Sequence, residues 1–180
     1  ERNDDYFKPG KPYLDRIIFQ TIPDANARVI AFERGEVDFL HAYIVPYDKV
    51  KTYRQDPRFT VVDFGLGVGT LELLLLNLDN PYLANKQVRQ ALAYAIDRND
   101  LNQKALFGAG KPATSIMASN QRYHTDKYDV YARDVAKANQ LLDQAGFPRG
   151  SDGKRFKLRL SVKTGTDYEE RAAQIIRSNL

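Results

Sequence analysis

The sequence of 180 residues contains no cysteine and only two histidines, His41 and His124. Without cysteine the chain can form no disulfide bond, no thiolate metal site and no cysteine nucleophile. Two isolated histidines also exclude a histidine-rich metal site. The absence of cysteine is compatible with an oxidising compartment, but it does not by itself assign one.

Long hydrophobic runs are absent as well. The longest apolar stretch, Leu71 to Leu76, is interrupted by Glu72. A membrane-spanning helix needs about 20 apolar residues, so the sequence predicts none. With 43% hydrophobic and 28% charged residues, the composition is that of a folded globular chain rather than a disordered one. The length fits one ordinary domain or two small ones.

Charge is distributed unevenly along the chain. Residues 71–180 carry 17 basic and 12 acidic side chains, whereas residues 1–70 carry 10 and 11. A basic excess can indicate a nucleic-acid interface. The basic residues are scattered, however, and the densest group, between Lys154 and Arg159, lies on and before one predicted strand. We therefore favour a solvated basic surface and expect no nucleic-acid partner.

Apolar periodicity predicts a mixed α/β (α+β) fold class. Helices are expected at residues 25–34, 47–53, 86–97, 101–107 and 132–145, and from Asp167 onward. Strands are expected at residues 15–22, 37–40, 59–64, 70–77 and 156–162. Residues 108–130 form a long irregular loop, and loops of that length are usually functional or packed on another element.

Helix ends and faces can also be predicted. Asp24 and Asp167 are expected N-caps, the second with Glu170 in a capping box. Gly35 should end the first helix, which we expect to be deeply buried. Three buried faces follow from the spacing: Val88, Ala91, Leu92, Ala95 and Ile96; Val135, Ala138, Leu142 and Ala145; and Tyr168, Ala172, Ile175 and Ile176. In the last predicted strand, Phe156, Leu158, Leu160 and Val162 alternate with polar residues.

Motifs for catalysis or cofactor binding fail on inspection. The glycines of Gly65-x-Gly67-x-Gly69 precede a leucine-rich strand, whereas a dinucleotide loop must open a helix. The segment Gly108–Pro112 lacks the first glycine and the final hydroxyl residue of a phosphate loop. Glu33, Glu36 and Asp38 surround a predicted helix end, where solvated charge is ordinary. Neither histidine has a nucleophile partner at a recognisable spacing, so we predict no catalytic residue, cofactor or metal.

Five segments in order and register resemble one known family. They are ERNDDYFKPGKPYLDRIIF, DANARVIAFERGEVDF followed by Val45-Pro46, LLLLNLDNP, NKQVRQALAYAIDRNDL and DVAKANQLLDQAGFP. Together they are similar to the middle of a family 5 extracellular solute-binding protein, the class of peptide-, nickel- and glutathione-binding subunits of ABC importers. The strongest part is VRQALAYAIDR, and the resemblance covers nearly the whole chain.

The resemblance implies a partial two-lobe, type II periplasmic-binding-protein-like (Venus flytrap) fold in a protein more than twice this long. Residues 1–69 would belong to the first lobe and residues 70–180 to the second, with a crossover strand near 70–77. The chain begins at Glu1 without a leader, so either a leader was removed or the chain is a piece of something longer. The resemblance implies an internal part of an exported protein, periplasmic or extracellular, with a signal peptide absent from this chain. Its partners would be a peptide or similar small solute and the permease subunits. Membrane attachment would come only through the permease or a lipid anchor.

The resemblance also implies where ligand would bind. Leu71, Leu73, Leu75 and Asn77 of the crossover, and Ser115 and Met117 of the loop at 112–120, are the expected ligand-binding residues. The leucines either line the cleft or fill the core, and the loop is either at the cleft mouth or plain surface. Gly65, Gly67 and Gly69 are either a hinge or ordinary turn glycines.

Two further points limit this interpretation. Some family members carry tyrosines and a carboxylate at the crossover, and the leucines found here disfavour a peptide with a charged end. Arg89 and Arg98 are expected to be structural ion-pair partners rather than ligand contacts. The competing interpretation is a hydrolase-type enzyme domain with an unrecognised site.

Overall fold

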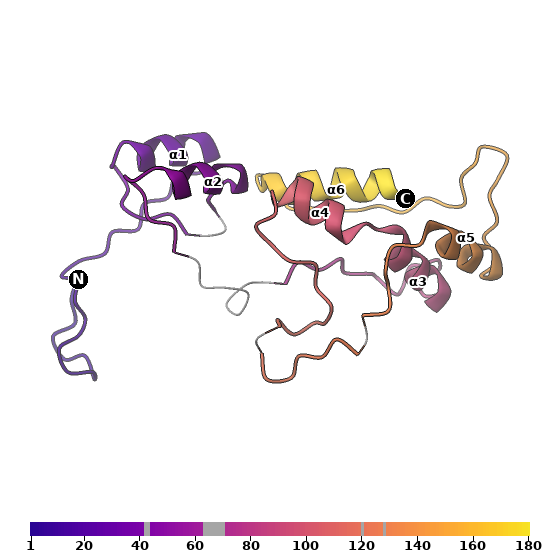
Figure 1. The fold of residues 1–180 in the computed structure, drawn as a ribbon, viewed down its shortest axis with the longest axis horizontal. Helices are drawn as coiled ribbons and strands as arrows, with labels where there is room; N and C mark the ends of the chain where they lie inside the picture. The colour runs from indigo at the N-terminus through magenta and orange to yellow at the C-terminus, as the bar shows by residue number, and fades with distance from the viewer. Residues whose placement is uncertain (42–43, 63–70, 120, 128) are drawn as a thin grey trace. The chain divides into compact units, whose positions relative to one another are not determined.

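The computed structural model describes residues 1–180 except 42–43, 63–70, 120 and 128, and the described part contains six helices (Figure 1). They are α1 (Ala25–Glu33), α2 (Tyr47–Gln55), α3 (Lys86–Ala95), α4 (Arg98–Ala105), α5 (Val135–Gln144) and α6 (Asp167–Asn179). The chain divides into two compact units, Glu1–Val45 and Pro46–Leu180. None of the described helices is both long and apolar enough to cross a bilayer.

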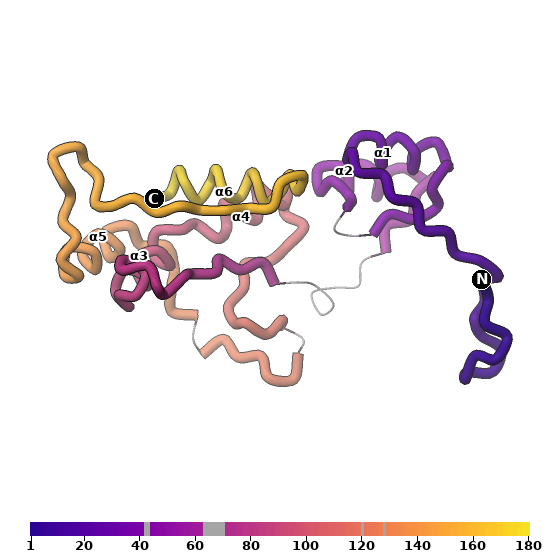
Figure 2. The backbone as a smooth tube through the Cα atoms, turned by 180° about the vertical axis from the view of Figure 1, so that it is seen from behind, coloured from indigo at the N-terminus to yellow at the C-terminus, as the bar shows by residue number. Residues whose placement is uncertain are grey.

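No β-strand is present among the described residues, so the strands expected at 15–22, 37–40 and 156–162 are wrong as assigned. The described residues of 59–64 and 70–77 are not strands either. Figure 2 shows residues 155–163 as a long extended run. Alternating side chains specify which face of a segment can be buried, but a strand also needs a hydrogen-bonded neighbour. Only the helical part of the predicted α/β architecture is therefore seen.

The first unit is built around α1. The predicted N-cap is confirmed, because the Asp24 carboxylate accepts a hydrogen bond from the Ala27 backbone N–H at 2.8 Å. Gly35 ends the helix with a φ of +74°, a conformation that favours glycine. Only Val29 and Ala31 are buried, so the expectation that this helix is deeply buried is wrong.

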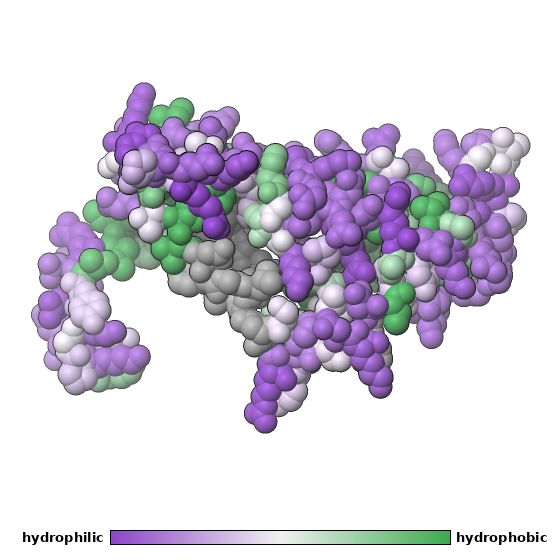
Figure 3. Space-filling view, viewed as in Figure 1, coloured by the Kyte–Doolittle hydropathy of each residue, from purple (hydrophilic) through white to green (hydrophobic). Residues whose placement is uncertain are grey.

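Apolar side chains that precede α1 lie at the surface of this unit. The fractions exposed are 62% for Leu14, 61% for Ile17, 77% for Ile18 and 92% for Phe19. Figure 3 shows the corresponding hydrophobic surface over the N-terminal unit. The predicted strand at 15–22 thus has the side-chain composition of a buried segment, although nothing within the described residues buries it.

The core of the second unit lies between α3 and α5, which pack against each other (Figures 1 and 2). One cluster consists of the buried residues Leu83, Val88 and Leu92, with Leu76, Leu142, Ala145, Phe147, Phe156 and Leu158 packed against it. A second cluster brings together three buried alanines, Ala91, Ala95 and Ala138. Small residues at these positions allow the two helix backbones to approach closely.

The predicted faces of these helices are confirmed except at their ends. Ile96 is only half-buried because α3 ends at Ala95, and Val135 is 43% exposed at the start of α5. Phe156 and Leu158 pack on the core as expected, whereas Leu160 and Val162 are 41% and 40% exposed. The alternation of apolar and polar residues therefore predicts burial correctly for Phe156 and Leu158, which lie next to the α3–α5 core, but not for the two apolar residues that follow.

Several helix ends differ from the prediction: α2 continues to Gln55, α4 spans Arg98–Ala105 rather than 101–107, and α5 begins at Val135 rather than at residue 132. The helix expected to run to residue 97 ends two residues earlier, because the Asp97 carboxylate caps α4 by accepting a hydrogen bond from the Asp100 N–H at 3.0 Å. At the last helix, Thr166 rather than Asp167 is the N-cap residue. Glu170 accepts instead from the Gly165 N–H at 3.2 Å, so the predicted capping box is shifted rather than formed as written.

Helix α4 packs against α6. The buried Ala105 of α4 lies at this interface, where its carbonyl accepts a hydrogen bond from Arg171 of α6 at 3.4 Å. The Asn179 side chain of α6 accepts from the Asp97 N–H at 2.8 Å. None of the stripe predicted for α6 is fully buried. Side chains of α3 and α4 contact the long segment that connects α4 to α5.

Candidate functional site

The connection between α4 and α5, residues 106–134, contains the predicted ligand-binding residues Ser115 and Met117. Its first part is tied to α4, where the Asn102 side chain accepts a hydrogen bond from the Gly110 N–H at 3.0 Å. A Cβ at Gly110 would lie 2.9 Å from Leu106 Cδ1 and 3.1 Å from Asn102 Oδ1, so a larger residue here would require these two side chains to shift. The other end is tied to α3, where the Tyr131 ring lies edge-on to that of Tyr94 at 5.1 Å.

Arg98, the first residue of α4, contacts both ends of this connection. Its Nη1 donates to the Ala113 carbonyl at 2.6 Å. Its Nη2 donates to the Asp129 carboxylate at 3.0 Å and to the Tyr131 carbonyl at 2.9 Å. Residues 113–131 therefore form a loop whose two ends meet at one guanidinium group, which we call the 113–131 loop. The expected ion-pair role of Arg98 is confirmed, although two of its three partners are backbone carbonyls.

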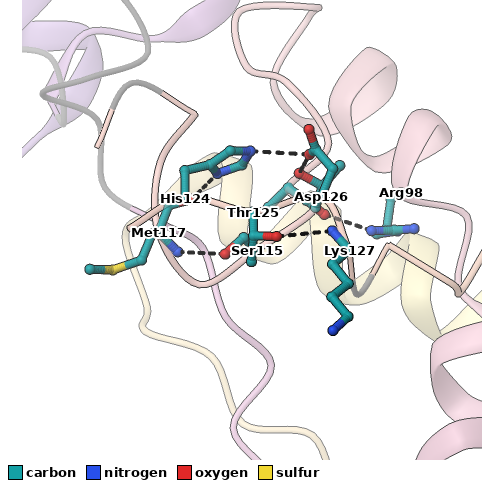
Figure 4. Close-up of polar contacts among 9 residues, drawn as sticks. Arg98, Ser115, Met117, His124, Thr125, Asp126 and Lys127 are labelled. Atoms are coloured by element: carbon teal, nitrogen blue, oxygen red, sulfur yellow. Dashed lines mark hydrogen bonds and ion pairs between the residues drawn. The ribbon is translucent and has the colours of Figure 1, made fainter. Parts of the chain in front are cut away.

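Ser115 and Met117 lie together inside the 113–131 loop (Figure 4). The Ser115 hydroxyl accepts a hydrogen bond from the Met117 N–H at 3.2 Å. The Met117 carbonyl in turn lies 2.8 Å from Nδ1 of His124. Both Ser115 and Met117 are half-buried. Met117 is therefore held by His124, which lies in the second half of the same loop.

Asp126 links the two arms of the 113–131 loop, by which we mean its first half, which contains Thr114, and its second half, which contains His124 and Asp126. Its Oδ1 accepts a hydrogen bond from the Thr114 hydroxyl and lies 3.1 Å from Nε2 of His124. The Thr114 hydrogen bond, followed by that of His124, lowers the pKa of the Asp126 carboxyl below its ordinary value of 3.8. The carboxylate is therefore ionised at neutral pH and braces the loop from within.

His124 faces hydrogen-bond acceptors on both ring nitrogens. The Met117 carbonyl contributes most to raising the pKa of His124 above its ordinary value of 6.5, partial desolvation opposes this, and Asp126 adds to it. The side chain is 16% exposed. His124 is therefore a largely buried, hydrogen-bonded residue of the loop.

The pair His124 and Asp126 has the composition of two members of a catalytic triad. In a triad the remaining ring nitrogen faces a nucleophile. Here that nitrogen faces the Met117 carbonyl, and the nearby Ser115 hydroxyl is hydrogen-bonded to a backbone N–H. In this geometry His124 stabilises the loop, and it is not placed to accept a proton from the Ser115 hydroxyl.

The predicted leucines of the crossover segment lie on a separate part of the unit. Leu73 is 60% exposed and Leu75 is 84% exposed, whereas Leu71 is half-buried. Leu76 packs on the core beside Val88. Successive side chains of an extended segment point to opposite sides, so Leu73 and Leu75 share the open side. Whether a ligand or another part of a longer protein covers that side stays a prediction.

Asn77 has a structural role at the end of the crossover segment. Its side-chain oxygen accepts a hydrogen bond from the Asp79 N–H at 3.0 Å, which forms a local turn. The glycines Gly65, Gly67 and Gly69, interpreted as a hinge or as turn residues, lie outside the described residues.

The crossover segment is also connected to α6. The Tyr168 hydroxyl donates a hydrogen bond to the Glu72 carboxylate at 3.0 Å. Burial, with a smaller effect of Glu72, raises the pKa of Tyr168 well above its usual range. The Tyr168 ring also meets that of Tyr47 on α2 edge-on at 5.4 Å. Tyr47 and Tyr168 lie in the same compact unit, Pro46–Leu180. The predicted lobe boundary between residues 69 and 70 would place them in different lobes, and that boundary stays a prediction.

An open groove of about 320 Å³ runs between α4 and α6, away from these predicted residues. Its lining residues are Asp100, Lys104, Arg171, Gln174, Ile175, Ser178 and Asn179. Lys104 and Asp100 form an ion pair at 2.8 Å across one turn of α4. In the described ranges, no three histidine or carboxylate side chains come together as a metal site.

The arrangement of helices and connecting segments is that of a periplasmic binding protein, as comparison with solved structures shows. The PBP AgaA from A. tumefaciens R10, solved with agropinic acid, superposes with a TM-score of 0.75 at 29% identity, over 98% of this chain and 34% of its own. The ABC transporter-associated periplasmic binding protein DppA from Helicobacter pylori, solved with the peptide STSA, gives a TM-score of 0.78 at 25% identity, over 98% of this chain and 32% of its own.

The sequence defines the family more narrowly. Residues 1–180 match the family model of the bacterial extracellular solute-binding proteins, family 5 Middle, and the chain belongs to this family. The oligopeptide-binding protein AppA of Bacillus subtilis is 31% identical over 100% of this chain and 34% of its own length. The nickel-binding periplasmic protein of Escherichia coli is 30% identical over 99% of this chain and 35% of its own. The family resemblance inferred from five segments is therefore confirmed.

This chain spans about a third of the length of those relatives. The family is one of solute-binding receptors rather than enzymes, and its members are periplasmic or extracellular.

Sequence reasoning missed the role of Asp126 and the two carbonyl contacts of Arg98. Thr114 and Asp126 are 12 residues apart, and no local pattern joins them. In the sequence, only the length of the irregular loop predicted at residues 108–130 indicated that it is functional or packed on another element.

Proposed function

We propose that the chain is the middle part of a longer receptor, which captures a peptide or similar small solute between two lobes and delivers it to an ABC permease. The observation that carries this proposal is the match of all 180 residues to the family 5 solute-binding proteins. The relatives named for oligopeptide, nickel and glutathione binding support the same class of function. A receptor of this kind needs two stiff lobes and a largely preformed cleft rather than a catalytic group.

Two segments are proposed to face the ligand. Leu73 and Leu75 offer exposed apolar surface on one side of the crossover segment, while Leu76 on the other side belongs to the core. The 113–131 loop offers Ser115 and Met117 from a braced structure. Such a combination of apolar wall and few fixed polar groups is typical of small-molecule sites. Leu71 and Asn77 complete the proposed set, with Leu71 half-buried and Asn77 held in a turn.

The proposed lobes are residues 1–69 and residues 70–180, with the crossover near 70–77. The leucines favour a ligand that presents apolar surface to the crossover, and they disfavour a charged peptide end there. In this proposal the receptor is exported, acts in the periplasm or at the cell surface, and contacts the membrane through the permease or a lipid anchor. It carries out no catalysis.

The proposal is tested with the longer receptor purified from its own host. Bound solute is released by denaturation and identified by mass spectrometry, and the stripped receptor is then offered a mixed oligopeptide library, glutathione and a nickel salt. We expect one class to be retained and to raise the melting temperature, because a ligand that binds only the folded state stabilises it. Retention of none of these, with no co-purified solute, would contradict the proposal.

A further inference from the structure

Three features hold the 113–131 loop, and they act at different places. Asp126 cross-links the arms through Thr114 and His124. The Tyr131 ring rests on Tyr94 of α3. Of these three features, only Arg98 bonds to residues at both ends of the loop. Its helix fixes its own position, because Asp97 caps α4 immediately before it.

The geometry at Arg98 requires a guanidinium group. Nη1 donates to the Ala113 carbonyl, while Nη2 donates to the Asp129 carboxylate and the Tyr131 carbonyl. A planar fork with donors in fixed directions can meet acceptors on both sides at once. A lysine ammonium has the same charge, but it is a single compact donor that cannot span acceptors served by two separate nitrogens.

Ser115 and Met117 lie two and four residues after Ala113, so the hydrogen bond from Arg98 fixes the chain just before them. Figure 4 shows Arg98 reaching from α4 toward the loop that carries both residues. Arg98 is 35% exposed and all its described partners belong to the loop.

We propose that Arg98 is a positioning residue for ligand binding: its guanidinium holds both ends of the 113–131 loop, so that Ser115 and Met117 are presented to the ligand in one conformation. This inference rests on the proposed receptor function. Arg98 itself does not touch the ligand. Its effect on affinity comes from preorganisation, because a loop that is already ordered loses less conformational entropy when ligand binds.

Arg89 provides a matched control on the neighbouring helix. Its Nη1 donates to the backbone carbonyls of Leu83 and Ala84, both at 2.9 Å, and it does not take part in the loop. Arg89→Lys and Arg98→Lys each remove guanidinium contacts to two backbone carbonyls, and Arg98→Lys also removes the guanidinium contact to Asp129. Both variants keep the net charge.

The experiment compares wild-type longer receptor with Arg98→Lys and Arg89→Lys in two measurements. Hydrogen exchange of residues 113–131 reports order in the loop without ligand, and retention of peptides from a mixed oligopeptide library, of glutathione and of nickel reports binding. We expect Arg98→Lys to increase exchange throughout the loop and to weaken retention of the solute class that wild type binds by about tenfold, since hydrogen bonds to charged groups are strong. Arg89→Lys should leave both unchanged within about twofold at a similar melting temperature.

Each outcome decides a separate point. If wild type retains a solute and the two variants behave alike in exchange and in retention, Arg98 is a structural residue and the inference is wrong while the receptor function stands. If Arg98→Lys increases exchange but binds as wild type does, the loop does not present the ligand-binding residues and the inference is again wrong. If wild type retains no peptide, glutathione or nickel, the proposed function fails and the inference fails with it.

Discussion

His124 lies between two hydrogen-bond acceptors, the Met117 carbonyl and the Asp126 carboxylate. Only the doubly protonated imidazolium can donate to both, because the neutral ring has one donor and one acceptor nitrogen. Protonation of one side chain thus controls a contact that joins the two arms of the 113–131 loop. The loop should respond to pH near neutrality, where histidine titrates.

The direction of this response follows from the raised pKa of His124. The stabilisation is complete below the ordinary value of 6.5 and is lost as pH rises through the higher folded value. The lowered pKa of Asp126 keeps its own contribution present above 3.8 and removes it only in stronger acid. We therefore expect higher hydrogen-exchange protection factors for residues 114–127 at about pH 5.5 than at about pH 8. In His124→Gln this difference should disappear; if it persists, another group is responsible.

At the scale of single elements, α3 and α5 meet through alanines. Ala138 is 3% exposed and lies against Ala91 and Ala95. A larger side chain at this position has no space, and overpacking of a core costs about 1–3 kcal/mol. Ala138→Leu should therefore lower the free energy of unfolding by that amount in a denaturant titration. The same substitution at the exposed Ala136 of α5 should change it by less than about 0.5 kcal/mol. Equal effects at both positions would show that helix propensity, not packing, is responsible.

The crossover segment allows a second comparison between neighbours. Leu75 is 84% exposed, whereas Leu76 packs on the core. In the longer receptor, Leu75→Asp should weaken solute binding by roughly tenfold or more while leaving the melting temperature unchanged, since the lost apolar contact belongs to the ligand. Leu76→Asp should lower the stability itself by about 2–4 kcal/mol, because it places a charge in the core. A large drop in melting temperature with Leu75→Asp would instead assign that side chain to a core.

The elements differ in how far the sequence predicts them. Helices α3 and α5 follow from apolar spacing, because the face that spacing defines is the face they bury against each other. The break at Ile96 was missed, since the helical pattern continues through it and only the capping by Asp97 ends α3. The strand assignments failed because alternating side chains predict an extended segment but not the hydrogen-bonded neighbour that a strand needs. The contacts of Arg98 could not be predicted, because they join residues 15 to 33 positions apart.

At the scale of the whole molecule, exposed apolar surface is the most informative feature. Phe19 and Ile18 are each more than three-quarters exposed, although they are large apolar side chains of the kind usually buried in a folded protein. The relatives are about three times as long as this chain. In the proposed receptor, the remaining parts of both lobes would cover such surface and complete the cleft.

The last prediction follows from that geometry: the 180-residue chain alone should bind solute far more weakly than the longer receptor. Small-ligand sites bury roughly 70–90% of the ligand surface, and one missing wall removes a large share of it. Losing on the order of 150 Å² of apolar burial at about 25 cal/mol per Å² costs about 4 kcal/mol, which is several hundredfold in affinity. The uncovered apolar surface should also promote self-association. Calorimetry on both proteins with the solute identified from the receptor measures the ratio, and light scattering checks that the chain is monomeric during titration. Equal affinities would mean that these residues contain the complete cleft, which would overturn the proposal that the site is shared with other parts of a longer receptor.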